Sequence, residues 1–314
     1  MKQHLRNFVL RCPITRELFF IIFCKKVNKK RIDKKILNLS TSPVSEKVDV
    51  IVSLTSYGAR LNELQYTLYS LVAQTVRPKK IIVNLAEKDF VALPPLLKHF
   101  EQYGVEYRQT EDLKSYKKLI PTLQAYPEEC IVTADDDLFY PKDWLEKLWK
   151  AHLENPDIIV CHLTAQISFI DDKLKPYSEW AFNKKQTKPS FKNLILSGGG
   201  TLFPPNSLHV DALKSELFMI LSPFADDIWD YFMAVLNGTK VMQISKSYTN
   251  VKYVNPYREY GLENGETLAQ VNVRLEKNDE QLRNILKHYD ISETKFIRLL
   301  NAGSDNICVQ SSFK

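Results

Sequence analysis

Three consecutive carboxylates, Asp135, Asp136 and Asp137, have the residue types and spacing that most clearly indicate chemistry in this chain. They follow Ile131-Val132-Thr133-Ala134, a short apolar and β-branched run that is typical of a buried strand. In an open α/β sheet, ligands bind just beyond the carboxyl ends of the strands. Adjacent like charges raise one another's pKa, so a cation is needed to keep all three ionised. Mg²⁺ or Mn²⁺ carrying a phosphate ester would meet this need, because both metals prefer hard oxygen ligands.

A simpler interpretation of the same residues stays open, in which Asp135 or Asp136 caps the helix that follows. Asp is among the residues preferred at helix N-caps and in turns. One aspartate alone would favour that interpretation, whereas three in succession after an apolar strand favour a metal or phosphate site.

A run of three glycines, Gly198, Gly199 and Gly200, precedes Thr201. Glycine lets the backbone approach a ligand closely or adopt a positive φ. No Gly-Lys-Ser/Thr sequence follows, so the run is not a P-loop. It also lacks the GxGxxG spacing, between a strand and a helix, of a dinucleotide-binding motif.

The pattern of apolar residues predicts the elements that must position these groups. From Val48 onward, β-branched runs alternate with segments whose apolar residues recur at helical spacing. Strands are expected over residues 48–54, 80–85, 105–107, 130–133, 157–163 and 239–244. Helices are expected over 117–126, from Pro141, and over 226–237. This alternation predicts an α/β fold with a mostly parallel central sheet and helices on both faces.

The net charge of +6 is distributed unevenly along the chain. Residues 1–47 contain twelve Lys and Arg against three Asp and Glu, which is +9 and leaves −3 for the remainder. A nucleic-acid-binding core should carry its positive patch on the fold itself, so that class of protein is disfavoured.

The N-terminal arm has an apolar run, Leu18 to Cys24, followed by the basic segment Lys25 to Lys35. The apolar run is shorter than the roughly 20 residues that span a bilayer. No small-residue cleavage site follows it, so a cleaved signal peptide is disfavoured. The arm fits contact with an anionic membrane surface, or equally an amphipathic helix packed on the body with a solvated basic face.

The five cysteines are scattered along the chain, and none has CxxC spacing. Cys130 and Cys161 lie in apolar runs expected to be buried. This pattern favours free thiols in a reducing compartment and predicts a cytoplasmic protein.

Five short motifs follow one another across roughly two-thirds of the chain. They are Ser53-Leu54-Thr55-Ser56-Tyr57, Ser115-Tyr116-Lys117-Lys118, Thr133-Ala134-Asp135-Asp136-Asp137-Leu138-Phe139-Tyr140-Pro141, Gly198-Gly199-Gly200-Thr201 and Phe224-Ala225-Asp226-Asp227-Ile228-Trp229. Residues 48–245 thereby resemble bacterial GT-A-fold glycosyltransferases of the family-2-like type. The group found in capsule and lipopolysaccharide gene clusters is the most similar. The chain is also similar to the capsular N-acetylglucosaminyltransferases of heparosan-type polymer synthesis.

The resemblance implies that the acidic triplet is the DXD motif of a nucleotide-sugar site that also includes Asp136. Asp137 would bind the metal most directly, and Asp135 would contact the donor ribose or the metal. The other donor-side residues that it implies are Thr55, Ser56, Tyr57, Arg60, Lys117 and Lys118. For the two lysines, a solvated helix start is the alternative. The acid that often holds uracil after the second strand is not evident, because Asn84-Leu85-Ala86-Glu87 stands at that place.

An inverting transferase also needs a general base for the acceptor hydroxyl. The resemblance implies Asp226 or Asp227, with a slight preference for Asp226 because its spacing to Trp229 matches the family pattern. The alternative is that one of them caps the helix and favours its positive end. Gly198, Gly199, Gly200 and Thr201 would line the acceptor side. The QxxRW signature of processive synthases is absent, which favours transfer of single sugars.

Taken together, these features predict a metal-dependent inverting glycosyltransferase. It would move a sugar from a nucleoside-diphosphate sugar, UDP-linked, onto a saccharide or lipid-linked acceptor in surface polysaccharide synthesis. Residues 1–40 would contact the cytoplasmic face of the inner membrane peripherally, and no nucleic acid would be bound.

Two other functions stay open. One is a non-catalytic module that binds a nucleotide sugar or a glycan. The other is a haloacid-type phosphohydrolase, which is disfavoured because Leu138-Phe139 follows the aspartates where that class has Gly-Thr or Gly-Val.

Three regions are expected along the chain. Residues 1–47 form a basic and apolar N-terminal extension, 48–260 a GT-A catalytic domain, and 261–314 a helical C-terminal extension. Within the last part, helices are expected at about 266–277, 279–289 and 293–301.

Overall fold

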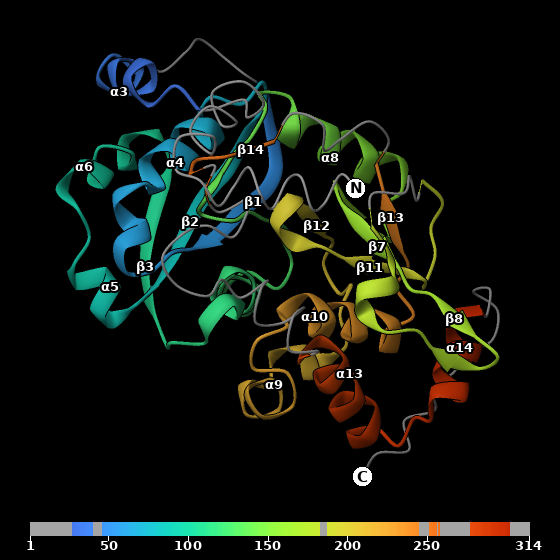
Figure 1. Cartoon of the computed structure of the whole chain (residues 1–314). Coiled ribbons are helices and arrows are strands. Elements are labelled where there is room, and N and C mark those ends of the chain that lie inside the picture. Colours follow the sequence, from blue (N-terminus) through green and yellow to red (C-terminus); the bar gives the residue numbers. More distant parts are fainter. Residues whose placement is uncertain are drawn as a thin grey trace, which may run out of the picture.

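In the computed structural model of the chain, a seven-stranded sheet lies between two groups of helices (Figure 1). The structure describes residues 27–39, 46–182, 187–244, 251–255, 257 and 277–301. The strand order is β13-β6-β12-β4-β1-β2-β3. These strands are β1 Lys47–Thr55, β2 Arg77–Ala86, β3 Val105–Thr110, β4 Cys130–Thr133, β6 Ile159–Cys161, β12 Thr201–Phe203 and β13 Val241–Gln243.

Helices and short 3-10 turns connect the strands. The α-helices are α3 Lys29–Leu37, α4 Leu64–Val72, α5 Glu87–Val91, α6 Pro95–Lys98, α7 Ile120–Ala125, α8 Trp144–Glu154, α9 Ser215–Leu221, α10 Asp226–Leu236, α13 Lys277–His288 and α14 Glu293–Asn301. The 3-10 turns are η1 Gly58–Asn62, η2 Glu101–Tyr103, η3 Lys114–Lys118, η4 Tyr177–Glu179, η5 Ser197–Gly199 and η6 Val210–Leu213.

Three smaller sheets complete the described part of the chain. One has three strands in the order β10-β7-β11, and the other two are the pairs β14–β5 and β8–β9. Their strands are β5 Leu138–Phe139, β7 Thr164–Gln166, β8 Phe169–Ile170, β9 Lys173–Leu174, β10 Ala181–Phe182, β11 Asn193–Ile195 and β14 Lys252–Tyr253.

The predicted α/β fold with a mostly parallel sheet is confirmed, with one reversal. β1, β2, β3, β4, β6 and β13 pair in parallel wherever they meet, whereas β12 runs antiparallel to both β4 and β6. β12 begins at Thr201, directly after the glycine run. The chain therefore passes the end of β4 before it re-enters the sheet in the opposite direction, which brings the glycine run beside the residues that follow β4.

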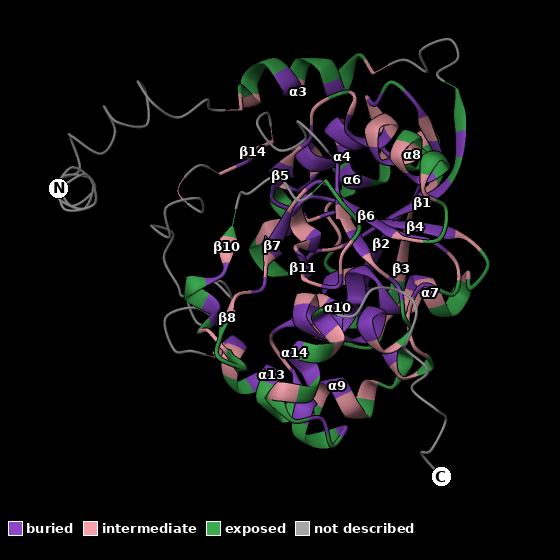
Figure 2. Cartoon of the chain, turned by 90° about the vertical axis from the view of Figure 1, so that its right-hand side faces the viewer, coloured by how far each residue is buried: buried purple, intermediate pink, exposed green. Residues whose placement is uncertain are grey.

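The sheet separates two hydrophobic cores. Along β1, Val50, Val52 and Leu54 point to one core, while Ile51 points to the other, as the two-residue period of a strand requires. Helices α3, α4, α6 and α8 supply the first core, and α7, α9, α10, α13 and α14 supply the second. Figure 2 shows the resulting pattern, with buried residues along the sheet and exposed residues on the outer faces of the helices.

Both terminal extensions contain helices that pack on the body. In α3, Ile32 and Ile36 are buried in the first core, and the basic face of the helix is exposed. The expected helices at 279–289 and 293–301 correspond to α13 and α14, and the one at 266–277 lies outside the described residues apart from its last position. Within the described ranges, no helix combines the length and apolar character needed to cross a bilayer.

Two helix starts differ from the expectation. α8 begins at Trp144, with Asp143 at the N-cap position, because the Pro141 carbonyl accepts the Trp144 N–H (3.1 Å) and Pro141 itself lies before the helix. The helix expected over 117–126 is divided into η3 and α7. Pro121 lies in the first turn of α7, where a missing N–H is tolerated.

Candidate active site

The acidic triplet lies at the carboxyl ends of β4 and β1, as the sequence predicts. Its middle residue, Asp136, is buried and accepts hydrogen bonds from the Ser56 hydroxyl (2.5 Å) and the Arg60 guanidinium (2.7 Å). The Thr67 hydroxyl donates to the Asp136 carbonyl (2.8 Å). Asp136 therefore binds the loop after β1 to the triplet and leaves the outer carboxylates, Asp135 and Asp137, for other contacts.

Arg60 supplies one of the cations that the triplet needs. Its guanidinium also lies 3.4 Å from the Asp137 carboxylate. Burial lowers the pKa of Arg60, but the charges of Asp136 and Asp137 outweigh burial and raise that pKa above its ordinary value. The half-exposed ring of Tyr57 lies 5.2 Å from the same guanidinium. The loop thus presents a positive charge and an open aromatic face beside the triplet.

Thr55 and Asn84 secure the ends of the two neighbouring strands. The Thr55 hydroxyl donates to the Asn84 carbonyl (2.7 Å). Asn84 is fully buried, and its amide donates to the Lys117 carbonyl (2.9 Å) and the Thr122 hydroxyl (2.9 Å). The Asn84 side chain therefore bonds within the interior of the protein.

Lys118 joins the triplet to the second acidic pair. Its ammonium lies 3.2 Å from Asp135 Oδ1 and 2.9 Å from Asp226 Oδ2. Burial lowers the pKa of Lys118, but these two carboxylates hold it well above the ordinary value. Lys117 is directed elsewhere, because its ammonium pairs with Asp112. Of the two predicted lysines, the structure brings only Lys118 to the acidic residues.

Asp226 and Asp227 lie in the first turn of α10. The Ser115 hydroxyl donates to Asp226 Oδ1 (2.9 Å). Asp227 Oδ1 accepts hydrogen bonds from the Ser197 N–H (3.0 Å) and the Ser197 hydroxyl. Burial, together with the neighbouring charge of Asp226, raises the pKa of Asp227 to about 6.

Helix capping does not account for either acidic group. The N-cap position of α10 is Ala225, which makes no side-chain capping bond, and α8 begins at Trp144, well after the triplet. The aspartates of both groups instead bond to side chains or backbone from other elements. The remaining benefit to α10 is the favourable position of negative charge at its N-terminus.

The glycine run lies so close to the triplet that a side chain at Gly198 would meet the Asp135 carboxylate. A Cβ atom at Gly198 would meet Asp135 Oδ2 at 2.2 Å. The Tyr140 hydroxyl donates to the Gly198 carbonyl (2.9 Å) and accepts the Asp135 N–H (2.8 Å). Tyr140 thereby ties the end of β4 to the glycine run, with Gly198 between Asp135 and the Ser197 that holds Asp227.

The end of the run is fixed by Trp144. Its indole N–H donates to the Gly199 carbonyl (2.8 Å), and a Cβ atom at Gly200 would meet the indole nitrogen at 2.4 Å. Gly200 also has φ +107°, a conformation that favours glycine. Thr201 is fully buried in β12, where its hydroxyl contacts the Cys161 sulfur (3.4 Å). The structure therefore places Thr201 in the sheet and not on the surface of the site.

Asp89 is a site residue that sequence reasoning missed. It is buried just after β2, and its Oδ1 accepts the Gly58 N–H (2.8 Å), which fixes the loop that carries Tyr57. Its Oδ2 has no hydrogen-bond partner among the described residues. Its position in the sequence could have identified it, because Asp89 is the first aspartate after the second strand and lies two residues beyond Glu87.

Asp230 is a second acid that the sequence analysis did not select. It lies one turn after Asp226 in α10, is 1% exposed, and its Oδ1 has no partner among the described residues. Burial raises the pKa of Asp230 well above its ordinary value, and the charges of Asp226 and Asp227 add to this effect.

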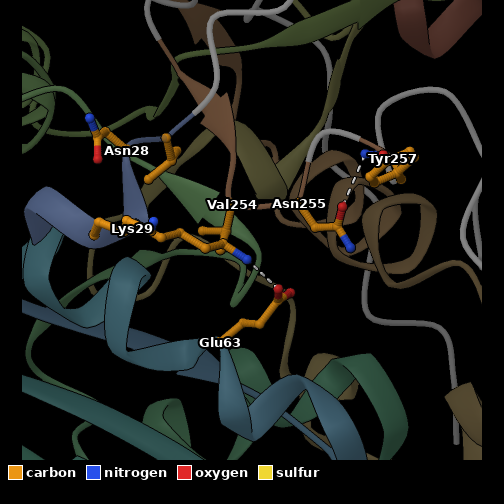
Figure 3. Close-up of a pocket in the computed structure, with 8 residues that line it drawn as sticks. Asn28, Lys29, Glu63, Val254, Asn255 and Tyr257 are labelled. Carbon is orange, nitrogen blue, oxygen red and sulfur yellow. Dashed lines mark hydrogen bonds and ion pairs between the residues drawn. The ribbon is translucent and has the colours of Figure 1, made fainter. Parts of the chain in front are cut away.

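A pocket of about 480 Å³ adjoins the end of η1, in the segment after β1 (Figure 3). It is lined by Val27, Asn28, Lys29, Lys30, Glu63, Val254, Asn255 and Tyr257. In Figure 3 the Lys29 ammonium, at the start of α3, reaches the Glu63 carboxylate that follows η1. On the opposite wall, the Val254 N–H donates to the Asp137 carbonyl (2.8 Å). α3 is thereby joined to the segment after η1, and the residue after β14 is joined to the triplet.

The carboxylates would hold a divalent metal together with a substrate. Within the described ranges, no group of three or more His, Cys, Asp or Glu could bind a metal ion by itself. The side chains of Asp135 and Asp137 are 36% and 11% exposed, and both offer hard oxygen atoms. Mg²⁺ is commonly bound by one or two carboxylates plus substrate phosphates. The residues present fit that arrangement.

The mostly parallel sheet, with acidic residues at the carboxyl ends of its strands, places the chain in the GT-A fold class. The model of Glycosyl transferase family 2 matches residues 52–209, half of the chain, and the chain belongs to this family. The matched range contains the loop after β1, the triplet and the glycine run, whereas α10 lies beyond it. The chain is accordingly a glycosyltransferase. A search of curated proteins found no match.

Among solved structures, the chain is similar to two of S. aureus TarS residues 1–349. The structure in complex with UDP has 15% identity and a TM-score of 0.43, and the match covers 80% of this chain and 75% of that one. The other has 16% identity and a TM-score of 0.44, covering 80% and 73%. The 4-diphosphocytidyl-2C-methyl-D-erythritol synthase of Anaerococcus prevotii has 14% identity and a TM-score of 0.41, covering 74% and 97%.

Proposed function

We propose that this glycosyltransferase is metal-dependent and inverting, and moves a sugar from a nucleoside-diphosphate sugar onto a saccharide or lipid-linked acceptor. The observation that carries the proposal is the position of Lys118, whose ammonium lies between Asp135 of the triplet and Asp226 of the second pair. A diphosphate site and a general base must lie close together in this reaction. The contact through Lys118 supports that arrangement.

On the donor side, the diphosphate would lie between Arg60, Lys118 and the outer carboxylates of the triplet. An ammonium group has three N–H donors, so Lys118 can retain both carboxylates and still donate to a phosphate oxygen. Asp137 and Asp135 would hold Mn²⁺ or Mg²⁺ together with the phosphates. When bound, the metal would act as a Lewis acid that stabilises the leaving nucleoside diphosphate.

The nucleoside would lie against the loop after β1. The half-exposed ring of Tyr57 is suited to stacking on a base. Asp89 holds that loop through Gly58 and has a second carboxylate oxygen without a protein partner in the described chain. The donor is proposed to be UDP-linked.

For the general base, the geometry favours Asp227, although the sequence spacing slightly favours Asp226. Both oxygens of Asp226 are already engaged, one by Ser115 and the other by Lys118. Asp227 uses only Oδ1, toward Ser197. A catalytic base works best when its pKa lies near the operating pH, and the pKa of about 6 brings Asp227 closer to that condition than an ordinary aspartate.

We also propose a biological setting for the enzyme. It would transfer single sugars in capsule or lipopolysaccharide synthesis, at the cytoplasmic face of the inner membrane. The basic face of α3 supports peripheral membrane contact by residues 1–40. Four exposed cations there have no ion pair among the described residues: Lys30, Arg31, Lys34 and Lys35. Because Ile32 and Ile36 pack on the body, contact with anionic lipid would involve this basic face.

Turnover of nucleotide sugars tests the proposal directly. The full chain is incubated with a panel of nucleoside-diphosphate sugars and saccharide acceptors, with Mn²⁺ or with EDTA, and release of the nucleotide is measured. We expect release from one donor class, loss of activity in EDTA, and loss in Asp137→Asn. Asp143→Asn, an aspartate paired with Lys147 outside the site, is the matched control. Binding of a nucleoside diphosphate without turnover of any donor would instead indicate a binding module.

A further inference from the structure

The first turns of α13 accept hydrogen bonds from the backbone at two places, one of them in the loop that precedes the proposed base. Asp279 Oδ1 accepts the Tyr177 N–H of η4 (2.9 Å). Gln281 Oε1 accepts the Phe224 N–H (2.8 Å), in the loop that leads into Asp226 and Asp227. Two side chains from one helical segment therefore connect the base loop to a neighbouring wall of the site.

Gln281 is held in a single orientation. It is 3% exposed, and its amide nitrogen donates to the Lys277 carbonyl (2.9 Å), which directs its oxygen toward Phe224. No side chain caps α10, so the loop before that helix depends on contacts from other elements. Tyr116 supplies one of them, through its hydroxyl to the Ser222 carbonyl (2.5 Å), and Gln281 supplies another from the opposite side.

Tyr177, in η4, is close enough to the acidic pair for the charges of Asp227 and Asp226 to act on it. Its ring is buried against Trp180, with ring centroids 5.0 Å apart. Burial raises the pKa of Tyr177, and the nearby charges of Asp227 and Asp226 raise it further. The structure records no hydrogen bond from its hydroxyl to another described residue.

The body of α13 is fixed rigidly enough to act as a brace. Leu282 and Ile285 are buried in the same core as α10. The Phe232 ring of α10 packs against Tyr289, which follows α13, with centroids 5.4 Å apart. Because α13 is packed in this core, its contacts with Phe224 and Tyr177 hold the loop before α10 and η4 in place relative to the core.

We propose that Asp279 and Gln281 are positioning residues that hold the loop before Asp227 in a fixed relation to η4, and thereby set where the acceptor hydroxyl lies. The inference rests on the proposed role of Asp227 as the base. It assigns the C-terminal extension to the acceptor side of the active site. A small displacement of a catalytic group is costly, since about 1 Å can reduce a rate by about 100-fold.

Two substitutions remove the acceptor oxygens with little change in size: Gln281→Met and Asp279→Leu. We expect either to lower kcat about 10-fold or more and to raise the acceptor KM, with the donor KM unchanged within about twofold. The conservative variant Asp279→Asn keeps an acceptor oxygen and should recover most of kcat. Arg283→Met, on the exposed face of the same helix, is the control. A merely structural role would instead impair donor and acceptor kinetics together, without rescue.

Hydrogen exchange provides a readout that does not depend on turnover. In the full chain, Gln281→Met should speed exchange in peptides that contain the Phe224 amide, and Asp279→Leu in those that contain the Tyr177 amide. Each should leave the other site and the amides of β1 unchanged. Unchanged exchange at both amides, or wild-type kcat in both variants, would overturn the proposal. Failure of the wild-type chain to transfer any sugar would overturn the proposed function without altering the exchange result.

Discussion

At the scale of single residues, the protein itself offsets part of the negative charge of the site. Arg60 pairs with Asp136 and Asp137, and Lys118 lies between Asp135 and Asp226. From the sequence, three adjacent carboxylates need a cation, and a metal is the expected one. Two side chains of the chain itself meet much of this need, so a metal would serve the diphosphate more than the resting protein.

The pH dependence of turnover should report Asp227. The base must be ionised to accept a proton, so protonation below its pKa of about 6 should lower kcat. We expect kcat to fall about tenfold per pH unit on the acid side of that value. Asp227→Asn should lose about 10²- to 10⁴-fold in kcat with the donor KM little changed. A profile that stays flat between pH 7 and pH 5 would count against Asp227.

Gly198→Ala tests the close approach of the glycine run to the triplet. The added Cβ would lie 2.2 Å from Asp135 Oδ2, so either the carboxylate or the backbone must move. We expect nucleoside-diphosphate affinity to fall about tenfold or more, because Asp135 is displaced. Gly238→Ala is a control outside the site, where a Cβ meets nothing within 4 Å although the positive φ adds some strain. Calorimetry measures the affinity, and wild-type affinity in Gly198→Ala would exclude a role for this contact.

At the scale of elements, one residue joins the end of β4, the start of α8 and the glycine run. The Tyr140 hydroxyl bonds to both the Asp135 N–H and the Gly198 carbonyl. Tyr140→Phe leaves both groups unpaired, so we expect the free energy of unfolding to fall by about 1–3 kcal/mol. Tyr69→Phe, which removes the hydroxyl of a ring stacked on Phe139, is the control. Denaturant unfolding measures both, and equal losses would show that the Tyr140 hydroxyl is not special.

The sequence predicted most elements because their apolar periods are strong. The runs at 48–54 and 130–133 became β1 and β4, and the helix from Asp226 ends before Gly238 as expected. The antiparallel direction of β12 could not be predicted, because it depends on where the chain returns after the three-stranded sheet. Pro141 was misassigned because its carbonyl, and not its ring, begins the turn into α8.

The sequence predicted which residues form the site better than it predicted the contacts between them. The triplet, Arg60, Lys118 and the acidic pair do come together, since they lie at strand ends or helix starts. Contacts that depend on distant partners, such as those of Tyr140, Ser197 and Gln281, leave no local pattern in the sequence. Proximity across 30 or more residues is decided by the packing of whole elements.

At the scale of the whole molecule, the described helices of the two terminal extensions lie at opposite ends. Figures 1 and 2 both place α3 at one end and α13 with α14 at the other. α3 is joined to the segment after η1 through Lys29 and Glu63, and α13 is joined to the proposed base loop through Gln281 and Phe224. A membrane contact through α3 would therefore orient the donor side relative to the bilayer.

Neutralising the basic face of α3 tests that orientation. Changing Lys30, Arg31, Lys34 and Lys35 to Gln should weaken binding to phosphatidylglycerol vesicles about 100-fold, because each cation near an anionic surface contributes separately. Turnover of soluble acceptors should not change. The control changes four exposed cations near the other end, Lys173, Lys188, Lys287 and Lys295. Co-sedimentation measures binding, and equal binding by the two quadruple variants would contradict a role for α3.

The measurement that tests the account most directly is calorimetric titration of the full chain with UDP, with and without Mn²⁺. We expect one site per chain, binding that strengthens with Mn²⁺, and a loss of about 100-fold in Asp137→Asn but not in Asp143→Asn, because Asp137 would help to hold the metal together with the diphosphate. Equal UDP affinity in the wild type and Asp137→Asn would contradict the assignment of the acidic triplet as the donor site.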